Sequence, residues 1–267
     1  MNAPGGRIQP APFVDWEWVA REAGHRPWPA PQRPWVFGQI WENLLFAHWR
    51  VPYDLLRHMV PPALTLETFD GEAWVGVVPF HLRYLGPRRS RRPFALDFLE
   101  LNVRTYVRAE DKPGVWFFSL DAASLPAVIG ARTGFHLPYF WADISMQIEG
   151  GRVAFASRRH HPGSSPVAFR GVYGPTDDVF NADPGTLEEW LTERYCFYSQ
   201  DRAGRIYRGE IAHARWPLQP AEATLEVADL ARSHRFDLAA EPLLHFSRRL
   251  EMVTWGPTRI GSSSPRG

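Results

Sequence analysis

The chain has 267 residues, of which 45% are hydrophobic and 22% are charged, and its formal net charge is +1. A chain of this length can bury a large core in one domain, and its balanced charge provides no general field for nucleic acid or an anionic membrane. One cysteine excludes an internal disulfide framework, no apolar run can span a bilayer, and the N-terminus lacks an apolar signal segment, so we expect a cytoplasmic protein.

The two ends of the chain differ in composition from its body. Residues 1–35 form an N-terminal extension rich in proline and tryptophan, in which Asp15 to Ala23 has the pattern of a short helix with Asp15 as its N-cap. Residues 259–267 have the composition of a disordered tail. Between them, residues 36–258 are expected to fold as a single domain.

In the body, strand patterns alternate with turn signals. Three hairpins are predicted, with turns at Asp70-Gly71, in the sequence AEDKPG (109–114) and at Gly150-Gly151. Helices are predicted after Pro52, over Ser124 to Gly134 and, with an amphipathic stripe, over Thr186 to Tyr198. Nine or ten strands and three helices predict an α+β fold, mainly an antiparallel β-barrel with a few flanking helices.

The strand FLELNVRTYV (98–107) carries the most informative pattern. Its side chains alternate, so Glu100, Asn102 and Arg104 share a face with Phe98 and Tyr106, and the apolar residues share the other face. The polar face either meets water or lines the interior of the barrel. In an interior, Arg104 would offer a forked site for a carboxylate, and Glu100 would be its neutralising partner or a base.

Several phrases match one family in order and spacing: LLFAHWRVP (44–52), TFDGEAWVGVVPF (68–80), FLELNVRTYV (98–107), ARTGFHLPYFWA (131–142) and IAHARWPL (211–218). On these phrases the chain resembles the YqjF-like family of uncharacterised bacterial proteins over residues 40 to 255. That family is similar in fold to acetoacetate decarboxylase, a cone-shaped β-barrel that forms a Schiff base on a buried lysine. The resemblance therefore implies the same architecture and brings no reaction with it.

The decarboxylase motif is only partly present. Its Gly-Arg pair, aromatic residue and Phe-Pro-Lys-Lys correspond here to Ala131-Arg132, Phe135 and Leu137-Pro138-Tyr139-Phe140, so Tyr139 stands where the Schiff-base lysine would be. A phenol cannot form an imine. The only lysine, Lys112, lies in a predicted solvated turn, where its pKa would be near ~10.4. If the protein is an enzyme, we expect it not to be a Schiff-base decarboxylase.

Four other residues have both a site role and a structural one. Arg132 either faces the pocket or bonds a backbone carbonyl, and Asp121 either pairs with an arginine of the site or caps the helix that follows. Arg194, on the predicted amphipathic helix, is either a pocket residue or a surface ion pair. His213, among aromatic residues, is either a base or ligand or a satisfied core residue.

No cofactor or metal is predicted, since the sequence has no H-E-x-x-H, no cysteine–histidine metal spacing, no G-x-G-x-x-G and no Walker loop. The preferred interpretation is a barrel that binds a small anionic ligand, a carboxylate or keto acid. The ligand would contact Asn102, Arg104, Asp121, Arg132, Arg194 and His213. Two alternatives stay open: a lyase- or isomerase-type acid/base enzyme with Glu100 as base and Tyr139 as acid, and an interaction scaffold that uses the tryptophans of the extension.

Overall fold

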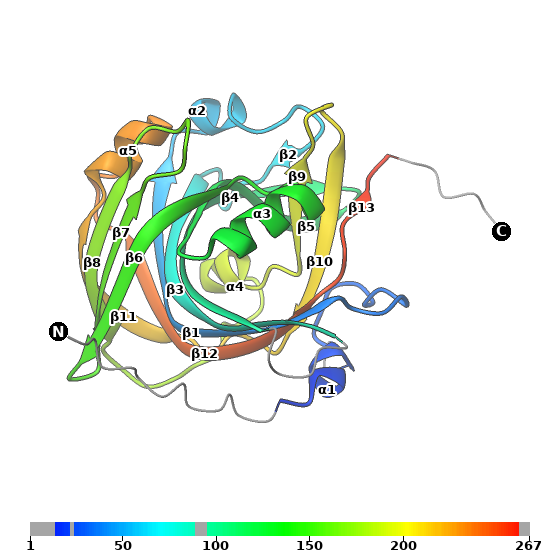
Figure 1. Cartoon of the computed structure of the whole chain (residues 1–267), viewed down its shortest axis with the longest axis horizontal. Coiled ribbons are helices and arrows are strands. Elements are labelled where there is room, and N and C mark those ends of the chain that lie inside the picture. Colours follow the sequence, from blue (N-terminus) through cyan, green and yellow to red (C-terminus); the bar gives the residue numbers. More distant parts are fainter. Residues whose placement is uncertain (1–13, 22–23, 89–94, 262–267) are drawn as a thin grey trace.

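The computed structural model (Figure 1) describes residues 14–21, 24–88 and 95–261, and strands dominate it. The strands are β1 (Phe37–Val51), β2 (Thr65–Leu66), β3 (Ala73–Pro87), β4 (Leu96–Ala109), β5 (Lys112–Ala122), β6 (Tyr139–Glu149), β7 (Arg152–Arg159), β8 (Ala168–Pro175), β9 (Cys196–Gln200), β10 (Ile206–His213), β11 (Gln219–Glu226), β12 (Leu243–Thr254) and β13 (Thr258–Arg259). The helices are α1 (Trp16–Arg21), α2 (Tyr53–Arg57), α3 (Leu125–Gly134), α4 (Leu187–Thr192) and α5 (Ala228–His234).

The strands close into two rings. The two rings share the strands β5, β4, β3, β1 and β12, which we call the shared wall. In what we call the small ring, β10, β9, β5, β4, β3, β1 and β12 pair in that order, and β12 returns to β10. In the large ring, β6, β7, β8 and β11 connect β5 to β12 around the other side of the shared strands. All of these pairings are antiparallel except those of β5 with β6 and β9, so the predicted barrel-like α+β class is confirmed.

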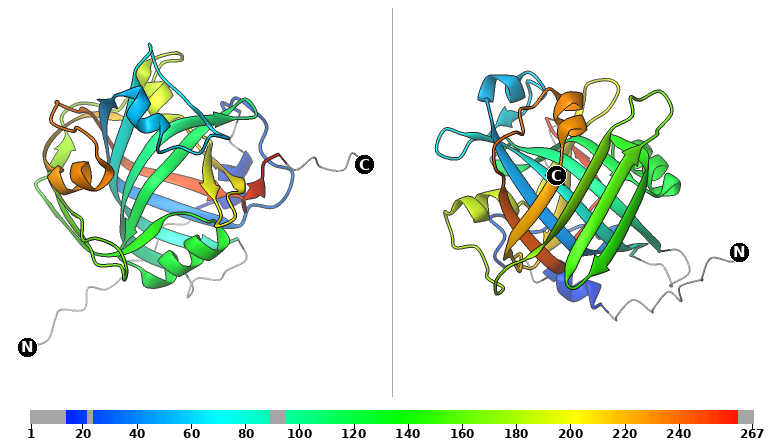
Figure 2. Two further views of the ribbon diagram at one scale, coloured as in Figure 1. Left: turned by 90° about the horizontal axis from the view of Figure 1, so that it is seen from above. Right: turned by 90° about the vertical axis from the view of Figure 1, so that its left-hand side faces the viewer.

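The helices lie at the ends and inside the small ring. In the two further views (Figure 2), α1 (dark blue) and α5 (orange) lie at opposite ends of the sheet. Helix α4 lies within the outline of the strands in Figure 1 and packs on the shared wall, since Leu191 clusters with Trp74 and Tyr106. In the described residues, no helix is long and apolar enough to cross a membrane.

Most of the predicted local signals are present. The β4–β5 hairpin turns at Glu110 and Asp111, both with positive φ, and β6–β7 turns at Gly150-Gly151. Asp15 caps α1, because its Oδ1 accepts hydrogen bonds from the backbone N–H groups of Glu17 and Trp18 at 3.1 and 3.0 Å.

The hairpin at Asp70-Gly71 is only partly as predicted. The turn forms, with φ of +49° and +83° and a bridge between Phe69 and Glu72. The strand before it, β2, pairs with β4 and not with β3. The reason is that β3 already has β1 on one side and β4 on the other, so it has no free edge.

The helix predicted over Thr186 to Tyr198 is wrong in its second half. Helix α4 ends at Thr192, and the β-rich residues after it form β9, which pairs with β10 and β5. Tertiary pairing therefore overrides the local helical stripe, and Arg194 lies in the connection between α4 and β9.

The helix α5 and the strands β8, β11 and β13 were not predicted. Because β13 includes Arg259, the predicted tail does not begin as disorder there, and residues 262–267 lie outside the described part.

The shared wall separates two interiors. The apolar face of β4, with Leu101, Val103 and Val107, packs in the large ring against Phe155 and Phe169. The opposite face of the wall contributes Phe46, Phe80 and other aromatic side chains to the small ring. A smaller cluster joins the N-terminal segment to the outside of the small ring through Val19, Trp35, Val253 and Trp255. The polar side chains of β4 therefore point into the small ring.

Candidate functional site

The polar face of β4 is buried inside the small ring and does not meet water. Glu100 is 2% exposed, and Asn102, Arg104 and Tyr106 are buried as well. The alternation predicted from the sequence is thus confirmed as two faces, one polar and one apolar, neither of them solvated. Burying several polar groups on one strand is costly unless they find partners, so their contacts decide what the site can do.

Glu100 and Tyr139 form a buried pair. Tyr139 is the first residue of β6, which runs parallel to β5 there, and its hydroxyl donates to Glu100 Oε2 at 2.9 Å. Burial raises the pKa of Glu100 to about 8, against the lowering effect of hydrogen bonds from Tyr139 and Asn102. Burial and the neighbouring Glu100 raise the pKa of Tyr139 well above its ordinary value. Near neutral pH, Glu100 is therefore mainly a neutral acid that can give up a proton.

Arginines and aromatic rings alternate from the wall toward α4. The Arg104 guanidinium lies 5.3 Å from the Phe46 ring and 5.9 Å from the Tyr106 ring. On the same ring of Tyr106, the Arg194 guanidinium lies at 5.0 Å, and it lies 4.5 Å from the ring of Trp190 on α4. We call Phe46, Arg104, Tyr106, Arg194 and Trp190 the stack. Its packing holds two guanidinium groups in fixed positions, where cation–π contacts stabilise each of them.

Tyr106 also contacts a histidine of β1, across the intervening strand β3. Its hydroxyl lies 2.7 Å from His48 Nε2, and burial, followed by Arg104, lowers the pKa of His48 well below its ordinary value. Gly76 on β3 makes this contact possible, because a Cβ at that position would lie 3.1 Å from the imidazole of His48. His48 is therefore neutral, and it adds no charge to the stack.

The positive charge of the stack is only partly neutralised. Arg194 donates to Glu67 at 2.5 Å, and Arg108 forms an ion pair with the same carboxylate at 2.8 Å. Arg104 makes no ion pair with any described carboxylate; its guanidinium donates to the Leu191 carbonyl at 3.4 Å and contacts Tyr106. Two donor atoms, Arg104 Nε and Arg194 Nη2, are buried without an acceptor among the described residues. Such a cluster favours an anion.

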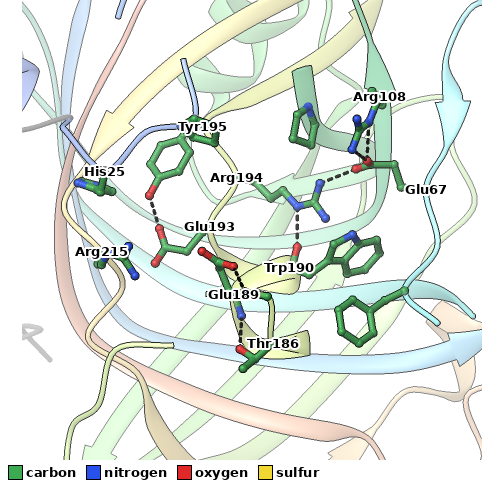
Figure 3. Close-up of a pocket in the computed structure, with 14 residues that line it drawn as sticks. His25, Glu67, Arg108, Thr186, Glu189, Trp190, Glu193, Arg194, Tyr195 and Arg215 are labelled. Atoms are coloured by element: carbon green, nitrogen blue, oxygen red, sulfur yellow. Dashed lines mark hydrogen bonds and ion pairs between the residues drawn. The ribbon is translucent and has the colours of Figure 1, made fainter. Parts of the chain in front are cut away.

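A cavity of about 230 Å³ lies at the outer end of the stack. Figure 3 shows its two sides: Arg194, Trp190, Glu67 and Arg108 on one, and His25, Tyr195, Glu193 and Arg215 on the other. Of the predicted site residues, Arg194 is the one that lines it, whereas Arg104 lies one layer deeper, behind Tyr106. A second, more open hollow of about 650 Å³ runs between α3 and β6, and none of the predicted site residues lines it.

Asp121 does not join this site. It pairs with Leu101 across the sheet, so its side chain points into the large ring, where its Oδ1 accepts from Arg159 at 2.8 Å. Burial raises the pKa of Asp121 to about 6 in spite of Arg159. The helix cap that was its alternative role belongs to Ser124, whose side chain accepts from the Ala127 N–H. Asp121 thus pairs with an arginine, but in the other interior.

Two further candidates make structural contacts. Arg132 donates to the backbone carbonyl of Tyr139 at 2.6 Å, which holds the start of β6 in place. His213, at the end of β10, has its Nδ1 at 2.6 Å from the Ala214 carbonyl and its Nε2 at 3.4 Å from the Arg194 carbonyl. Both therefore support residues of the site through the backbone, and their direct contact with a ligand stays a prediction.

The sequence had suggested that Lys112 lies in a solvated turn, and this prediction is wrong. Its ammonium group forms an ion pair with Glu210 at 2.8 Å and lies 5.3 Å from the ring of Trp28. Several members of the site were not predicted, among them His48, Glu67, Trp190 and His25. The face of Tyr106 was predicted correctly, but no role in the site was predicted for it. In the described residues, no three His, Cys, Asp or Glu side chains are placed to hold a metal ion.

Comparison with known families shows to which family the chain belongs. Residues 38–251 match the family DUF2071, whose description is "Uncharacterized conserved protein". The uncharacterized protein YqjF of Bacillus subtilis (strain 168) is 41% identical over 227 residues, which cover 84% of this chain and 93% of that protein. The chain belongs to this family. The resemblance seen in the sequence is therefore confirmed.

Solved structures confirm the architecture. Acetoacetate decarboxylase from Legionella pneumophila superposes with a TM-score of 0.56 at 14% identity, covering 94% of this chain and 98% of that one. The enduracididine biosynthesis enzyme MppR, complexed with pyruvate, gives a TM-score of 0.60 at 13% identity, covering 88% and 94%. At these identities the likeness establishes an acetoacetate-decarboxylase-like fold and nothing about the reaction.

Proposed function

We propose that the protein binds a small organic anion, a carboxylate or keto acid, in the cavity at the end of the stack. The observation that carries this proposal is Arg194, which lines the cavity, is buried, and keeps its Nη2 atom without an acceptor among the described residues. Burial lowers the pKa of Arg194, although Glu67 opposes this, so the guanidinium is short of solvation. A ligand carboxylate would give it a further hydrogen-bond acceptor.

The second arginine strengthens the site without reaching the cavity. Arg104 lies behind Tyr106 and has no ion pair with a described carboxylate, so its field adds to that of Arg194. Glu100 does little to cancel this charge at neutral pH, because its raised pKa keeps much of it protonated. The pyruvate bound by MppR is consistent with an anion in this type of fold, as an analogy only.

A thermal-shift screen tests the proposal with acetate, pyruvate, acetoacetate and succinate on the full chain. A ligand at about 100 times its dissociation constant stabilises a protein by about 2.7 kcal/mol, which is a measurable rise in Tm. We expect this rise in wild type, its loss in Arg194→Met and a smaller rise in Arg104→Met. The control Arg152→Met removes an exposed arginine paired with Glu222 and should respond like wild type. No rise with any of these acids in wild type would contradict the proposal.

A second candidate function is acid/base catalysis by Glu100 and Tyr139, favoured by their 2.9 Å hydrogen bond and the raised pKa of Glu100. Neither residue lines the cavity, so this function requires a substrate that reaches further into the small ring. Its test is turnover of any acid that the screen finds. Loss of turnover with retained binding in both Glu100→Gln and Tyr139→Phe would support it, and unchanged turnover in either would argue against it.

The scaffold interpretation has lost most of its basis. Trp16 stacks on Tyr84 at 5.4 Å, and Trp28 donates its Nε1–H to Glu210 at 2.9 Å. Of the three tryptophans on which that interpretation depended, only Trp18 is well exposed, at 50%. A single exposed ring is ordinary for a protein surface and indicates no partner.

A further inference from the structure

The cavity is walled by flat rings on two sides. On the side of α4, the Trp190 ring packs 5.9 Å from that of Phe69, next to the guanidinium of Arg194. On the opposite side, the Tyr195 ring meets the His25 imidazole edge-on at 5.5 Å, and Pro27 extends this surface. Figure 3 shows Trp190 on one side of the cavity and Tyr195 and His25 on the other, with Arg194 and Glu193 between them. An acid as small as acetate would touch Arg194 and leave these rings in water.

The N-terminal segment that carries His25 is fixed by a buried charge cluster. Arg26, whose side chain is fully buried, donates to Glu210 Oε2 at 2.9 Å, and Trp28 Nε1 donates to the same oxygen at 2.9 Å. Lys112 pairs with the other oxygen of Glu210 at 2.8 Å. Arg26 also lies 5.7 Å from the Tyr195 ring. Three donors on one carboxylate hold His25 and Pro27 against Tyr195 as a defined wall.

This wall lies outside the part of the chain that matches the family. The match begins at residue 38, whereas His25 and Pro27 belong to the preceding segment. The arginines of the stack and the rings of Trp190 and Tyr195 lie within it. The shared domain therefore supplies the anion-binding group, and the segment before it supplies one face of the space where the rest of a ligand would lie.

From this arrangement we infer that the site takes a carboxylate with a flat, unsaturated or aromatic body, and that His25, with Pro27, is a specificity-determining element. The inference rests on the proposed anion site. The carboxylate contacts Arg194, and the body lies between Trp190 and the pair formed by Tyr195 and His25. Flat rings prefer offset-stacked or edge-to-face contacts with one another, which a puckered ring cannot make.

Two acids of similar size and the same charge test the shape of the ligand. Trans-cinnamate is planar, and 3-cyclohexylpropanoate carries a puckered, saturated ring on a chain of the same length. Isothermal titration of the full wild-type chain should show cinnamate binding about tenfold more tightly, near the upper limit of what aromatic contacts add beyond buried area. Both acids should lose binding in Arg194→Met.

Variants then separate the wall from the anion site. In His25→Ala the preference for cinnamate should fall toward equal affinity, while both acids still bind. Glu210→Gln should have the same effect by loosening the segment, with faster amide hydrogen exchange over residues 24–36. Trp18→Ala is the matched control, because Trp18 is an exposed ring of the same N-terminal region that does not line the cavity. Its preference should equal that of wild type.

The outcomes are distinguishable. Equal affinity of wild type for the two acids, with both lost in Arg194→Met, would overturn the inference about the flat body and leave the anion site standing. An undiminished preference for cinnamate in His25→Ala would overturn the role of the N-terminal wall. Failure of wild type to bind either acid, together with a negative thermal-shift screen, would overturn the anion site and this inference with it.

Discussion

The two interiors on either side of the shared wall contain buried charge in opposite arrangements. In the large ring, Asp121 and Arg159 form a close pair beside a large apolar cluster. In the small ring, Arg104 and Arg194 share the Tyr106 ring, and only Arg194 has a carboxylate. A paired charge contributes to one unique packing, whereas an uncompensated charge is a cost to the fold. The comparison supports the proposal that the small ring holds the ligand site, with the large ring as a core.

The largest expected effect comes from breaking the pair in the large ring. Asp121→Ala leaves Arg159 buried without its counter-charge, which should lower the free energy of unfolding by about 3–5 kcal/mol. The measurement is urea denaturation at a pH well above the pKa of about 6 of Asp121, where the pair is ionised. Glu222→Ala, which breaks an exposed pair with Arg152, is the control and should cost about 0–1 kcal/mol. Equal losses would mean that the large-ring pair is not special.

A pH titration tests the small ring through Glu100. Its pKa is about 8 in the folded protein, from an ordinary value of 4.5, so the folded state keeps a proton that the unfolded chain releases. Between these two pH values this carboxyl should make the folded protein less stable by about 1.4 kcal/mol per pH unit as the pH rises. Its contribution is fully present below 4.5 and is lost as the pH passes about 8.

The difference between wild type and Glu100→Gln isolates this group, because Asp121 and the buried histidines titrate in both proteins. We expect the free energy of unfolding of Glu100→Gln, measured in urea at a series of pH values, to fall less steeply than that of wild type. Parallel curves would show that Glu100 titrates normally, and they would remove the main support for an acid/base role.

Removing the unpaired charge of Arg104 should change the free energy of unfolding in the opposite direction from removing the paired charge of Asp121. In Arg104→Met, an apolar side chain of similar length replaces a buried cation that has no ion pair with a described carboxylate. Replacements of this kind are often neutral or stabilising by about 1–4 kcal/mol. We expect a raised Tm in the absence of ligand, together with a weaker response to carboxylates. A strongly destabilised Arg104→Met would place Arg104 among the structural residues and blur the contrast between the rings.

The sequence could predict one side of this contrast well. The alternation in residues 98–107 gave the correct faces of β4, and the turn residues at Gly150-Gly151 gave a correct hairpin, because both signals are local. The side of the wall to which Asp121 belongs depends on its register with Leu101, after a bulge between Val103 and Arg104 in the β4–β5 pairing. No pattern within one strand contains that information.

The contacts of Arg194 were beyond sequence reasoning for a related reason. The residues after Thr192 have a helical stripe, and only the edges of β5 and β10 make them a strand. Glu67, Trp190 and His25 come from three distant segments, and each is unremarkable in its own surroundings. The proposed anion-binding role of Arg194 depends on their meeting, whereas the alternation of the polar face of β4 is visible within one strand.

The smallest expected effect comes from Gly76 in the shared wall, and it tests whether the stack positions Arg194. Gly76→Ala places a methyl group 3.1 Å from the imidazole of His48, on the small-ring side, so the ring must shift by a few tenths of an ångström, which disturbs its contact with the Tyr106 hydroxyl. Overpacking of this kind costs about 1–3 kcal/mol. Gly130→Ala, in the exposed part of α3 with nothing within 4 Å, is the matched control and should stabilise by about 0.5–1 kcal/mol. If the stack positions Arg194, Gly76→Ala should also weaken carboxylate binding, which Gly130→Ala should leave unchanged. A loss of stability without weaker binding would mean that His48 supports the wall and not the site.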